Sequence, residues 1–432
     1  MSPAAAPKAA SPCFREAFWV WLKVGCLGFG GPAGQIALMH REVVERRGWI
    51  DEARFAHALS FCMLLPGPEA QQLAVWLGWR LHGVRGGVAA GLLFVLPGLA
   101  VMLGLSALYV AHGQAPWAGP ALLGLKAAVV ALVLQALLRM GGRTIRGVAA
   151  WWSAGLAFLA LSFTNLPFPL VILVAGGVGW ALGGGTVAAQ AAEVEPARPG
   201  WRVALACLAA WLAPVLLALV LAPGSSVAHM GLVFSSLAVV SFGGAYAALA
   251  YVGQAAGAFG WLASSQMLDG LGLAETTPGP LVLVFVFVGF VGAYQTAPAE
   301  WAWLAGLAGG LMAAWTTFAP SFLWIFAGGP FVERLRARPR PARALALVSA
   351  AAVGVIASLA FWFALSLLFP HAGVWTWGPL HARVPALAGL DWPALGLVIL
   401  AALLVWAARL PILATVAAMV AAGLALGALG MA

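Results

Sequence analysis

Long apolar runs separated by short basic loops dominate this chain. Nine runs carry few or no charges. Most are long enough to cross the roughly 30 Å hydrocarbon core of a bilayer, which takes about 20 helical residues. They cover residues 86–112, 116–138, 147–163, 168–182, 203–221, 301–327, 344–369, 393–408 and 410–432. They do not alternate polar and apolar positions as the strands of a membrane barrel do. The pattern predicts an all-α polytopic membrane protein.

Two stretches of the chain are imperfect copies of each other, and glycine and proline interrupt the apolar sequence in both. The first copy contains GFGGPAGQIALMH, which begins at Gly28, and LLPGPEAQQ, which begins at Leu64. The second contains SFGGAYAALAY, from Ser241, and ETTPGPLVL, from Glu275. The two breaks are 37 residues apart in the first copy (29 to 66) and 36 in the second (242 to 278). Paired interrupted segments in two membrane-embedded halves are the best sequence indication of a transporter binding site.

The composition agrees with a membrane protein. Of the 432 residues, 63% are hydrophobic and 8% are charged, whereas soluble domains contain about 25% charged residues. The net charge of +9 would suggest a nucleic-acid partner in a soluble protein. Here the arginines lie in short loops, as the positive-inside rule expects, so we expect no nucleic-acid partner. The four cysteines lack metal-ligand spacing, so neither a disulfide framework nor a metal site is expected, and the N-terminus lacks the apolar core of a cleaved signal peptide.

The basic clusters define a topology. All of them fall on one side if the apolar runs cross the membrane in turn, and that side is the cytoplasm by the positive-inside rule. The second copy then begins at the outer face. Its segment 253–266 corresponds to 41–54 but contains no charged residue, as inversion of the second copy predicts. The basic clusters are residues 41–54, 80–85, 139–146, 198–202 and 334–343.

We therefore expect two homologous halves arranged as inverted-topology repeats with broken or re-entrant helices. Residues 1–200 form the first repeat, residues 201–226 a connecting transmembrane helix, and residues 227–432 the second repeat. The chain is expected to contact the lipid bilayer as a multi-pass membrane protein. The sequence also allows a homodimer.

The Pro-Gly-Pro segments admit two arrangements. Arg54 and Arg80 flank the first segment, and both are expected at the cytoplasmic face. Each arm between them has about 11 residues, or roughly 16 Å of helix, which is half a bilayer. A re-entrant hairpin with the Pro-Gly-Pro at its tip fits this length. The alternative is a single broken crossing, which raises the number of spans from nine to thirteen and leaves the inversion unchanged.

The breaks predict an anion-binding site. Backbone groups freed by a break at bilayer depth are tolerated only where protein or a polar cavity satisfies them. Proline is well accommodated in the first turn of a helix, so the second arm is expected to begin near the midplane, where its free N–H groups and dipole favour an anion. Alternatively, the glycines only allow tight helix packing. The expected substrate-binding residues at the breaks are Gly30, Gly31, Pro66, Gly67, Pro68, Gly243, Gly244, Pro278, Gly279 and Pro280.

Two lysines in apolar segments are candidates to offset the charge of a dianion, because burying a charge in a membrane is expensive. Lys23 lies about one turn before the first Gly-Gly break, and Lys126 lies in the middle of an otherwise uncharged run. Lys23 can instead extend its ammonium to the interface. Lys126 can instead pair with a carboxylate.

Polar residues next to the Pro-Gly-Pro breaks are further candidates. Glu69, Gln71 and Gln72 follow the first break and are expected to line the pathway, with Glu69 as a proton-coupling group. Asp269 and Glu275 precede the second break and are further proton-coupling candidates. The alternative for these carboxylates is a structural role at a helix end.

The sequence contains no nucleotide-hydrolysis motif such as GxxxxGK[ST]. Transport energy is therefore expected from an ion gradient, with the proton gradient as the first candidate, or from the gradient of the substrate. No Ser/His/Asp or metal constellation suggests an enzyme, and no cofactor is expected.

Several of these motifs resemble the chromate transporter (CHR) family in its long, two-domain form. FGGPAGQIALMHREVVERRGWIDEARF, CMLLPGPEAQQLA and GWRLHG are similar to its first domain, and SFGGAYAALAYV with MLDGLGLAETTPGPL to its second. The resemblance covers nearly the whole chain. It implies chromate export across the inner membrane, chromate resistance, two halves of opposite orientation and thirteen spans. The residues by themselves predict an anion transporter, so a carrier of sulfate or another oxyanion and a passive anion channel remain alternatives.

Overall fold

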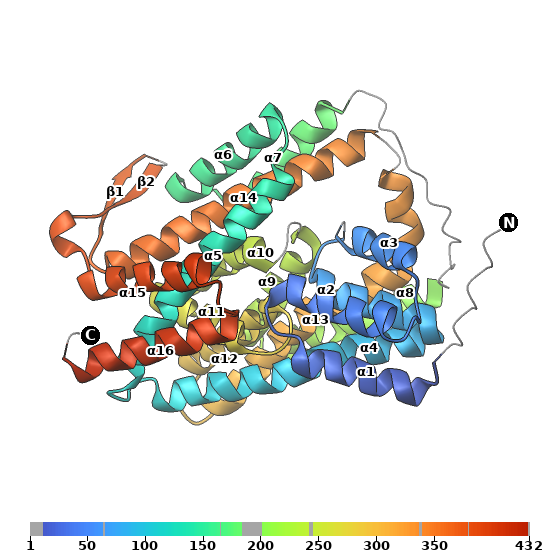
Figure 1. Ribbon diagram of the computed structural model, residues 1–432, viewed down its shortest axis with the longest axis horizontal. Coiled ribbons are helices and arrows are strands. Elements are labelled where there is room, and N and C mark those ends of the chain that lie inside the picture. Colours follow the sequence, from blue (N-terminus) through green and yellow to red (C-terminus); the bar gives the residue numbers. More distant parts are fainter. Residues whose placement is uncertain are drawn as a thin grey trace.

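The computed structural model describes residues 12–63, 65–164, 166–183, 201–241, 245–336, 339–378 and 380–430. The chain folds mainly into helices, many of which run roughly along the long axis of the molecule (Figure 1). Within these ranges, five helices are long and apolar enough to cross a membrane, so the predicted all-α membrane fold is confirmed. They are α4 (Glu69–His112), α5 (Ala118–Thr144), α8 (Trp201–Leu221), α13 (Ala302–Arg336) and α14 (Pro339–Leu368).

The N-terminal helices form a first hairpin at the Gly-Gly break. Its arms are α1 (Phe14–Leu27) and α2 (Gly31–His40), which continues into a π-helical turn, η1 (Arg41–Glu45). Ion pairs join the two arms of this hairpin. Glu16 near the start of α1 lies 3.8 Å from Arg47, just after η1, and Lys23 lies 3.0 Å from Glu42. The chain therefore turns back at the glycines instead of crossing in one direction.

A second hairpin follows at the first Pro-Gly-Pro. Its arms are α3 (Glu52–Cys62) and the first part of α4, which ends at a kink where His82 and Gly83 leave the helical conformation. Both outer ends lie beside the open end of the first hairpin. His40 Nε2 is 2.7 Å from Glu52 Oε2 at the start of α3, and His82 Nε2 is 2.8 Å from the carbonyl oxygen of Pro12. This is the geometry of the predicted re-entrant hairpin.

The second repeat builds the same two hairpins. The arms are α9 (Ser226–Val240) with α10 (Ala245–Ala258), and α11 (Ser264–Thr276) with the 3-10 turn η2 (Leu281–Leu283) and α12 (Val284–Thr296). Their outer ends also lie together. Ser226 Oγ is 2.7 Å from Thr296 Oγ1, and the ring of His229 stacks on Phe259 with a centroid distance of 5.3 Å.

The second part of α4 shows that the two pairs of hairpins enter from opposite sides. This helix leaves the first hairpins at Gly83, and Gly98 then lies so close to the carbonyl of Pro278 that a β-carbon there would clash. Farther along, Tyr109 donates a hydrogen bond to Asp269, in the middle of α11. The helix thus runs about 22 Å from the open ends of the first repeat to the tips, and then about 16 Å toward the open ends of the second. The halves are inverted.

The remaining helices are exchanged between the repeats. Helices α6 (Val148–Phe163) and α7 (Phe168–Ala181) pack on α14, whereas α15 (Trp392–Ala402) and α16 (Ile412–Ala428) pack on α5. Small residues allow the close contacts, as is usual between membrane helices. Gly354 of α14 lies against the backbone of Ala154, and Gly124 of α5 against the backbone of Met419. Each repeat thereby completes the packing of the other.

Two smaller elements lie near the end of the chain. A π-helical turn, η4 (Leu403–Ala407), follows α15. An antiparallel β-hairpin of β1 (Gly373–Trp377) and β2 (Leu380–Val384), followed by the 3-10 turn η3 (Leu387–Gly389), joins α14 to α15. The apolar pattern did not predict this hairpin.

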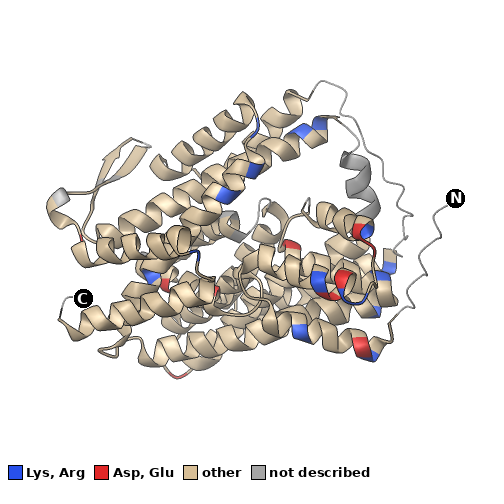
Figure 2. Cartoon of the chain, in the orientation of Figure 1, with Lys and Arg blue, Asp and Glu red and all other residues tan. Residues whose placement is uncertain are grey.

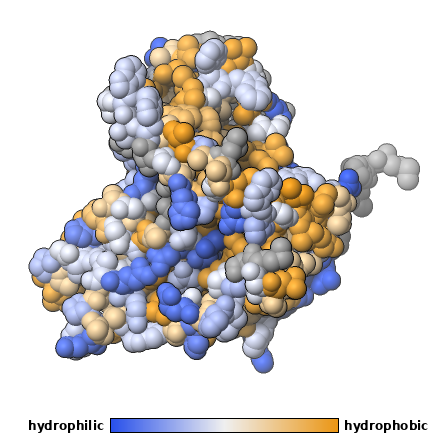
Figure 3. Space-filling view, turned by 90° about the vertical axis from the view of Figure 1, so that its left-hand side faces the viewer, coloured by the Kyte–Doolittle hydropathy of each residue, from blue (hydrophilic) through white to orange (hydrophobic). Residues whose placement is uncertain are grey.

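Charged residues are distributed unevenly along the long axis. Most of the Lys and Arg ribbon in Figure 2 lies toward the right-hand end of the view, where α1, α3 and α8 are found. Figure 3 shows the opposite end, where hydrophilic residues form a strip across a face that is otherwise rich in hydrophobic residues. The concentration of basic residues at one end agrees with the topology predicted from the arginines.

Candidate functional site

The Gly-Gly tip of the first repeat meets the Pro-Gly-Pro tip of the second. The N–H of Gly279 donates a 2.9 Å hydrogen bond to the carbonyl of Gly28. Gln35, one turn into α2, is fully buried, and its Nε2 donates to the carbonyls of both Gly28, at 3.2 Å, and Gly279. We call these three residues junction 1. It ties the two repeats together through main chain and one side-chain amide.

The other two tips form junction 2, which consists of Gly67, Ser241 and Gln72. The N–H of Gly67 donates a 3.0 Å bond to the carbonyl of Ser241. The Nε2 of the buried Gln72 donates at 2.7 Å to Pro66, within its own repeat. A shift of 213 positions superimposes the Gly-Gly breaks (29 on 242) and thus Gly28 on Ser241. The two main-chain bonds are therefore copies of one bond, related by the repeat.

Half-helix N-termini gather at these junctions. In each hairpin the second arm begins at the tip, so α2, α4, α10 and η2 all start there. Gly30, Pro68 and Pro280 are the N-cap residues of α2, α4 and η2, and none provides a side-chain cap. The first N–H groups of a helix have no partner within it, and they carry the positive end of the dipole. Such uncapped ends favour binding of an anion.

Two side-chain atoms that have no hydrogen-bond partner in the described part of the chain lie in or beside junction 2. They are Gln72 Oε1 and Ser321 Oγ; within the described residues Gln71 Oε1, next along α4, and Gln35 Oε1, at junction 1, are also buried and unpaired. Gln71 Nε2 is anchored to the carbonyl of Phe318 at 3.3 Å. A cavity of about 20 Å³ adjoins Gly67. A cavity of this size holds about one water molecule, so the junction is closed in this structure.

The predicted glycines and prolines of the described tips are all at the junctions. Gly30, Gly31, Gly67 and Gly279 have positive φ angles of 89°, 68°, 114° and 108°. The carbonyl of Pro66 accepts from Gln72, and the carbonyl of Pro278 lies against Gly98 of α4. Pro68 and Pro280 directly precede the second arms. Gly243 and Gly244 lie outside the described residues. Binding of substrate at these positions remains a prediction.

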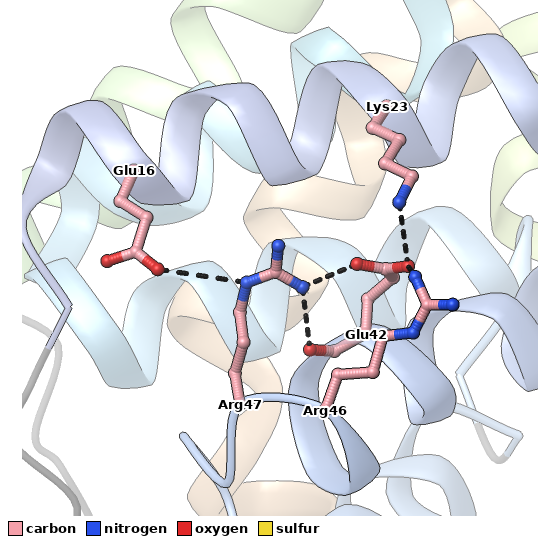
Figure 4. A network of polar contacts seen from close by, with 5 residues as sticks. All are labelled: Glu16, Lys23, Glu42, Arg46 and Arg47. Atoms are coloured by element: carbon pink, nitrogen blue, oxygen red, sulfur yellow. Dashed lines mark hydrogen bonds and ion pairs between the residues drawn. The ribbon is translucent and has the colours of Figure 1, made fainter.

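Lys23 lies on α1 about one turn before the Gly-Gly tip and pairs with a buried carboxylate on η1. Figure 4 shows the network: the fully buried Glu42 accepts from Lys23 at 3.0 Å, from Arg46 at 2.8 Å and from Arg47. Arg47 also reaches Glu16, on α1. Burial raises the pKa of the Glu42 carboxyl, but the bonds from Lys23 and Arg47 outweigh it and hold the pKa below its ordinary value. The network joins the two arms of the hairpin.

His40 adds a titratable group at the end of α2. Its two ring nitrogens lie 2.7 Å from Glu52 and 3.1 Å from Glu45, and its ring meets Phe55 edge-on. The hydrogen bond with Glu52, together with that of Glu45, raises the pKa of His40 above its ordinary value of 6.5. A protonated His40 therefore clamps α2 to the start of α3.

Lys126 and Asp269 form an ion pair between the repeats. Lys126 Nζ, on α5, lies 3.2 Å from Asp269 Oδ1, on α11, and the side chains are 18% and 4% exposed. Tyr109 donates at 3.0 Å to the other oxygen of Asp269. Asp269 lies about 10 Å along α11 from the second Pro-Gly-Pro. This geometry agrees with the alternative in which Lys126 pairs with a carboxylate.

The other two predicted proton-coupling residues differ from each other. Glu275 is buried near the second tip and accepts a 2.8 Å bond from Tyr246 of α10. Glu69 is the first residue of α4, next to Pro68, and within the described residues no hydrogen bond or ion pair to its side chain is found. Glu69 is thus the carboxylate closest in the chain to a half-helix N-terminus.

The structure brings two further polar side chains to the tips that the sequence pattern did not single out. Gln35 and Ser321 are polar residues within apolar runs, and that was the signal that could have singled them out. Gln35 bonds to a carbonyl of the other repeat, and Ser321 lies beside Gly67 of the other repeat, so the sequence did not indicate either contact. Among the described residues no cluster of three His, Cys, Asp or Glu side chains is placed to hold a metal ion.

The chain matches the family model of the chromate transporter over residues 15–180 and 228–427. A chromate transport protein of Pseudomonas aeruginosa is 36% identical over 351 residues, which are 79% of this chain and 78% of that protein. A chromate transport protein of Cupriavidus metallidurans is 28% identical over 79% of this chain and 80% of that protein.

A shorter relative matches one half of the chain. This uncharacterised transporter of Bacillus subtilis is 32% identical over 155 residues, which are 77% of that protein but 35% of this chain. No solved structure matches the chain.

Proposed function

Since the chain belongs to the chromate transporter family, we propose that it exports chromate from the cytoplasm across the inner membrane and so confers chromate resistance. The family and the apolar helices establish a multi-pass membrane transporter. The substrate is a tetrahedral oxyanion dianion, and sulfate, which is nearly isosteric with chromate, is the competing substrate. The repeat boundaries proposed are residues 1–200 and 227–432, joined by residues 201–226.

The observation that carries this proposal is the meeting of uncapped half-helix N-termini at the two junctions. Gly30, Pro68 and Pro280 leave the first N–H groups of three arms without a side-chain cap. In other transporters with inverted repeats, such N-termini near the midplane face anionic groups of the substrate. N–H groups and dipole ends bind a dianion without requiring a cation of equal charge beside it.

The closed state of the junctions favours a carrier over an open channel. Main-chain bonds from Gly67 to Ser241 and from Gly279 to Gly28 join opposing tips. Passage of an oxyanion requires at least one of these bonds to open. Alternating opening from the two sides follows from the inverted arrangement.

Membrane potential and protons both contribute to the energy of export. A potential that is negative inside drives anions outward, and each elementary charge is worth about 2.3 kcal/mol per 100 mV. Glu69, Asp269 and Glu275 are the groups proposed to carry a coupling proton. An uncoupler is expected to abolish net export, because it removes both components of the proton-motive force.

Reconstitution tests the function directly. Purified protein in liposomes loaded with unlabelled chromate should accumulate labelled chromate by counterflow, which a channel does not do. Competition by sulfate, molybdate and arsenate defines the selectivity. In a sensitive host, expression should lower chromate accumulation. Unchanged accumulation with the protein present in the membrane would contradict the chromate assignment, and saturable counterflow of sulfate alone would replace it.

A further inference from the structure

Ser321 is a buried hydroxyl group that has no hydrogen-bond partner within the part of the chain that the structure describes. It lies on α13, its side chain has no solvent exposure, and no group of the described residues accepts from or donates to its Oγ. The neighbouring hydroxyls behave differently. Thr316 donates to the carbonyl of Met312 at 2.7 Å, and Thr317 to that of Ala313 at 2.6 Å. An unpaired buried polar group is costly and rare, so it calls for an explanation.

The Ser321 hydroxyl lies beside junction 2. A β-carbon placed on Gly67 would lie 3.7 Å from Ser321 Oγ and 3.0 Å from Gln72 Nε2. Gly67, with its φ of 114°, therefore leaves free the space between an amide of the first repeat and a hydroxyl of the second. This glycine also supplies an N–H, now bonded to Ser241.

A small cavity also borders Gly67 and Ser241 of junction 2, and neither Gln72 nor Ser321 lines it. Gly67, Pro68, Ser241 and Thr317 contribute to its lining, and the other lining residues are apolar. Its volume of about 20 Å³ accommodates one water molecule but not an ion with four oxygen atoms. The cavity can grow only if the tips move apart and the bond between Gly67 and Ser241 opens.

We propose that Ser321, Gln72 and the N–H of Gly67 form a subsite for the oxyanion at junction 2. The proposal rests on the proposed function and locates its substrate. When the bond to Ser241 opens, the Gly67 N–H, the Gln72 amide and the Ser321 hydroxyl donate hydrogen bonds to the oxyanion. The half-helix N-terminus after Pro68 adds its dipole. Junction 1, where Gln35 bonds across the repeats, remains closed.

The two junctions differ in a way that supports this assignment. At junction 1 both hydrogens of the Gln35 amide are used by carbonyls of opposite repeats. At junction 2, among the described residues, which do not include 242–244, the Gln72 amide bonds within its own hairpin and one main-chain bond joins the tips. The position that corresponds to Gln35 in the second repeat is Ala248, which has no amide. Junction 2 is therefore the easier of the two to open.

The test is Ser321→Ala in the full-length protein, with chromate and sulfate as probes of saturable counterflow in liposomes. We expect the KM for the transported oxyanion to increase about tenfold or more in Ser321→Ala, because the substitution removes the donor of a hydrogen bond to a charged ligand. The melting temperature should be unchanged or higher, because the substitution removes only an unpaired buried hydroxyl. The matched control is Thr316→Val, on the same helix and equally buried, which should retain the wild-type KM.

The outcomes separate the subsite from the function. If the wild-type protein shows no saturable exchange of either oxyanion, the proposed function fails. If the wild type exchanges and Ser321→Ala keeps the wild-type KM, the subsite is overturned and the function stands. If Ser321→Ala does not fold, the hydroxyl has a structural partner and the subsite is likewise overturned. An equal increase of KM in Thr316→Val would show a general effect of altering α13.

Discussion

The N–H of Gly279 donates a 2.9 Å hydrogen bond to the carbonyl of Gly28, 251 positions earlier in the chain. The repeat reproduces this bond between Gly67 and Ser241 at 3.0 Å. Each Pro-Gly-Pro tip thus donates an N–H to the carbonyl at the end of the first arm of the Gly-Gly hairpin in the other repeat. Such backbone groups at bilayer depth must be satisfied by protein, and here the two halves satisfy each other. A reversible opening of these bonds is the simplest way for the halves to expose a site.

The tip glycines should be intolerant of any side chain. Gly67→Ala and Gly279→Ala place a β-carbon at φ angles of 114° and 108°, and 3.0 Å from Gln72 Nε2 or 2.9 Å from Leu283 Cδ1. Backbone strain of this kind costs about 1–3 kcal/mol. We expect loss of most counterflow activity in both variants, with the protein still present in the membrane. Gly104→Ala, in a helical position of α4 with open space around it, is the control and should be active. Wild-type transport by Gly67→Ala would contradict a close approach at the tip.

The inversion predicts labelling from opposite sides. Ala53, at the start of α3, and Ala263, the N-cap of α11, are both exposed and occupy the open ends of equivalent hairpins. Cysteines introduced at these positions in a cysteine-free background should react with an impermeant thiol reagent from opposite faces of the membrane. We expect Ala53→Cys to react from the cytoplasmic face. Reaction of both from one face would refute the inverted arrangement.

The ion pair between Lys126 and Asp269 should stabilise the contact between the repeats. Lys126→Ala leaves the carboxylate of Asp269 buried without its cation, which typically costs about 3–5 kcal/mol in a buried pair. The melting temperature in detergent should therefore fall clearly. The double variant Lys126→Met/Asp269→Leu removes both charges and should recover most of the loss. Wild-type stability of Lys126→Ala would show that the pair contributes little, and a loss of substrate affinity alone would return Lys126 to the binding site.

The clamp at His40 predicts a pH dependence of stability. The folded-state pKa of His40 lies above its ordinary 6.5, because Glu52 and Glu45 bond to the protonated ring. Its contribution is fully present below about pH 6.5 and is lost as the pH rises through the raised folded value. Both carboxylates are exposed, so the effect should be below about 1 kcal/mol. The difference in melting temperature between wild type and His40→Gln should shrink with rising pH. A difference that stays constant with pH would exclude titration of His40 as its cause.

Much of the architecture followed from the sequence because it depends on local pattern. Apolar runs of membrane-spanning length predicted the helices, and glycine and proline predicted where the hairpins turn, since these residues act on the backbone of their own segment. The spacing of the two breaks and the loss of arginine from residues 253–266 predicted two inverted halves. The tip residues Gly67 and Gly279 could be named for the same reason.

The pairings across the repeats were decided only by the tertiary structure. The sequence singled out Lys126 and Asp269 separately, but it could not join them, because nothing local relates residues on α5 and α11. Gln35 and Ser321 looked like ordinary polar residues in apolar helices until two tips from opposite sides met beside them. A repeat specifies the shape of each half through its own backbone preferences. Which side chains and carbonyls meet depends on how the halves pack, and that contact brings together residues about half the chain apart.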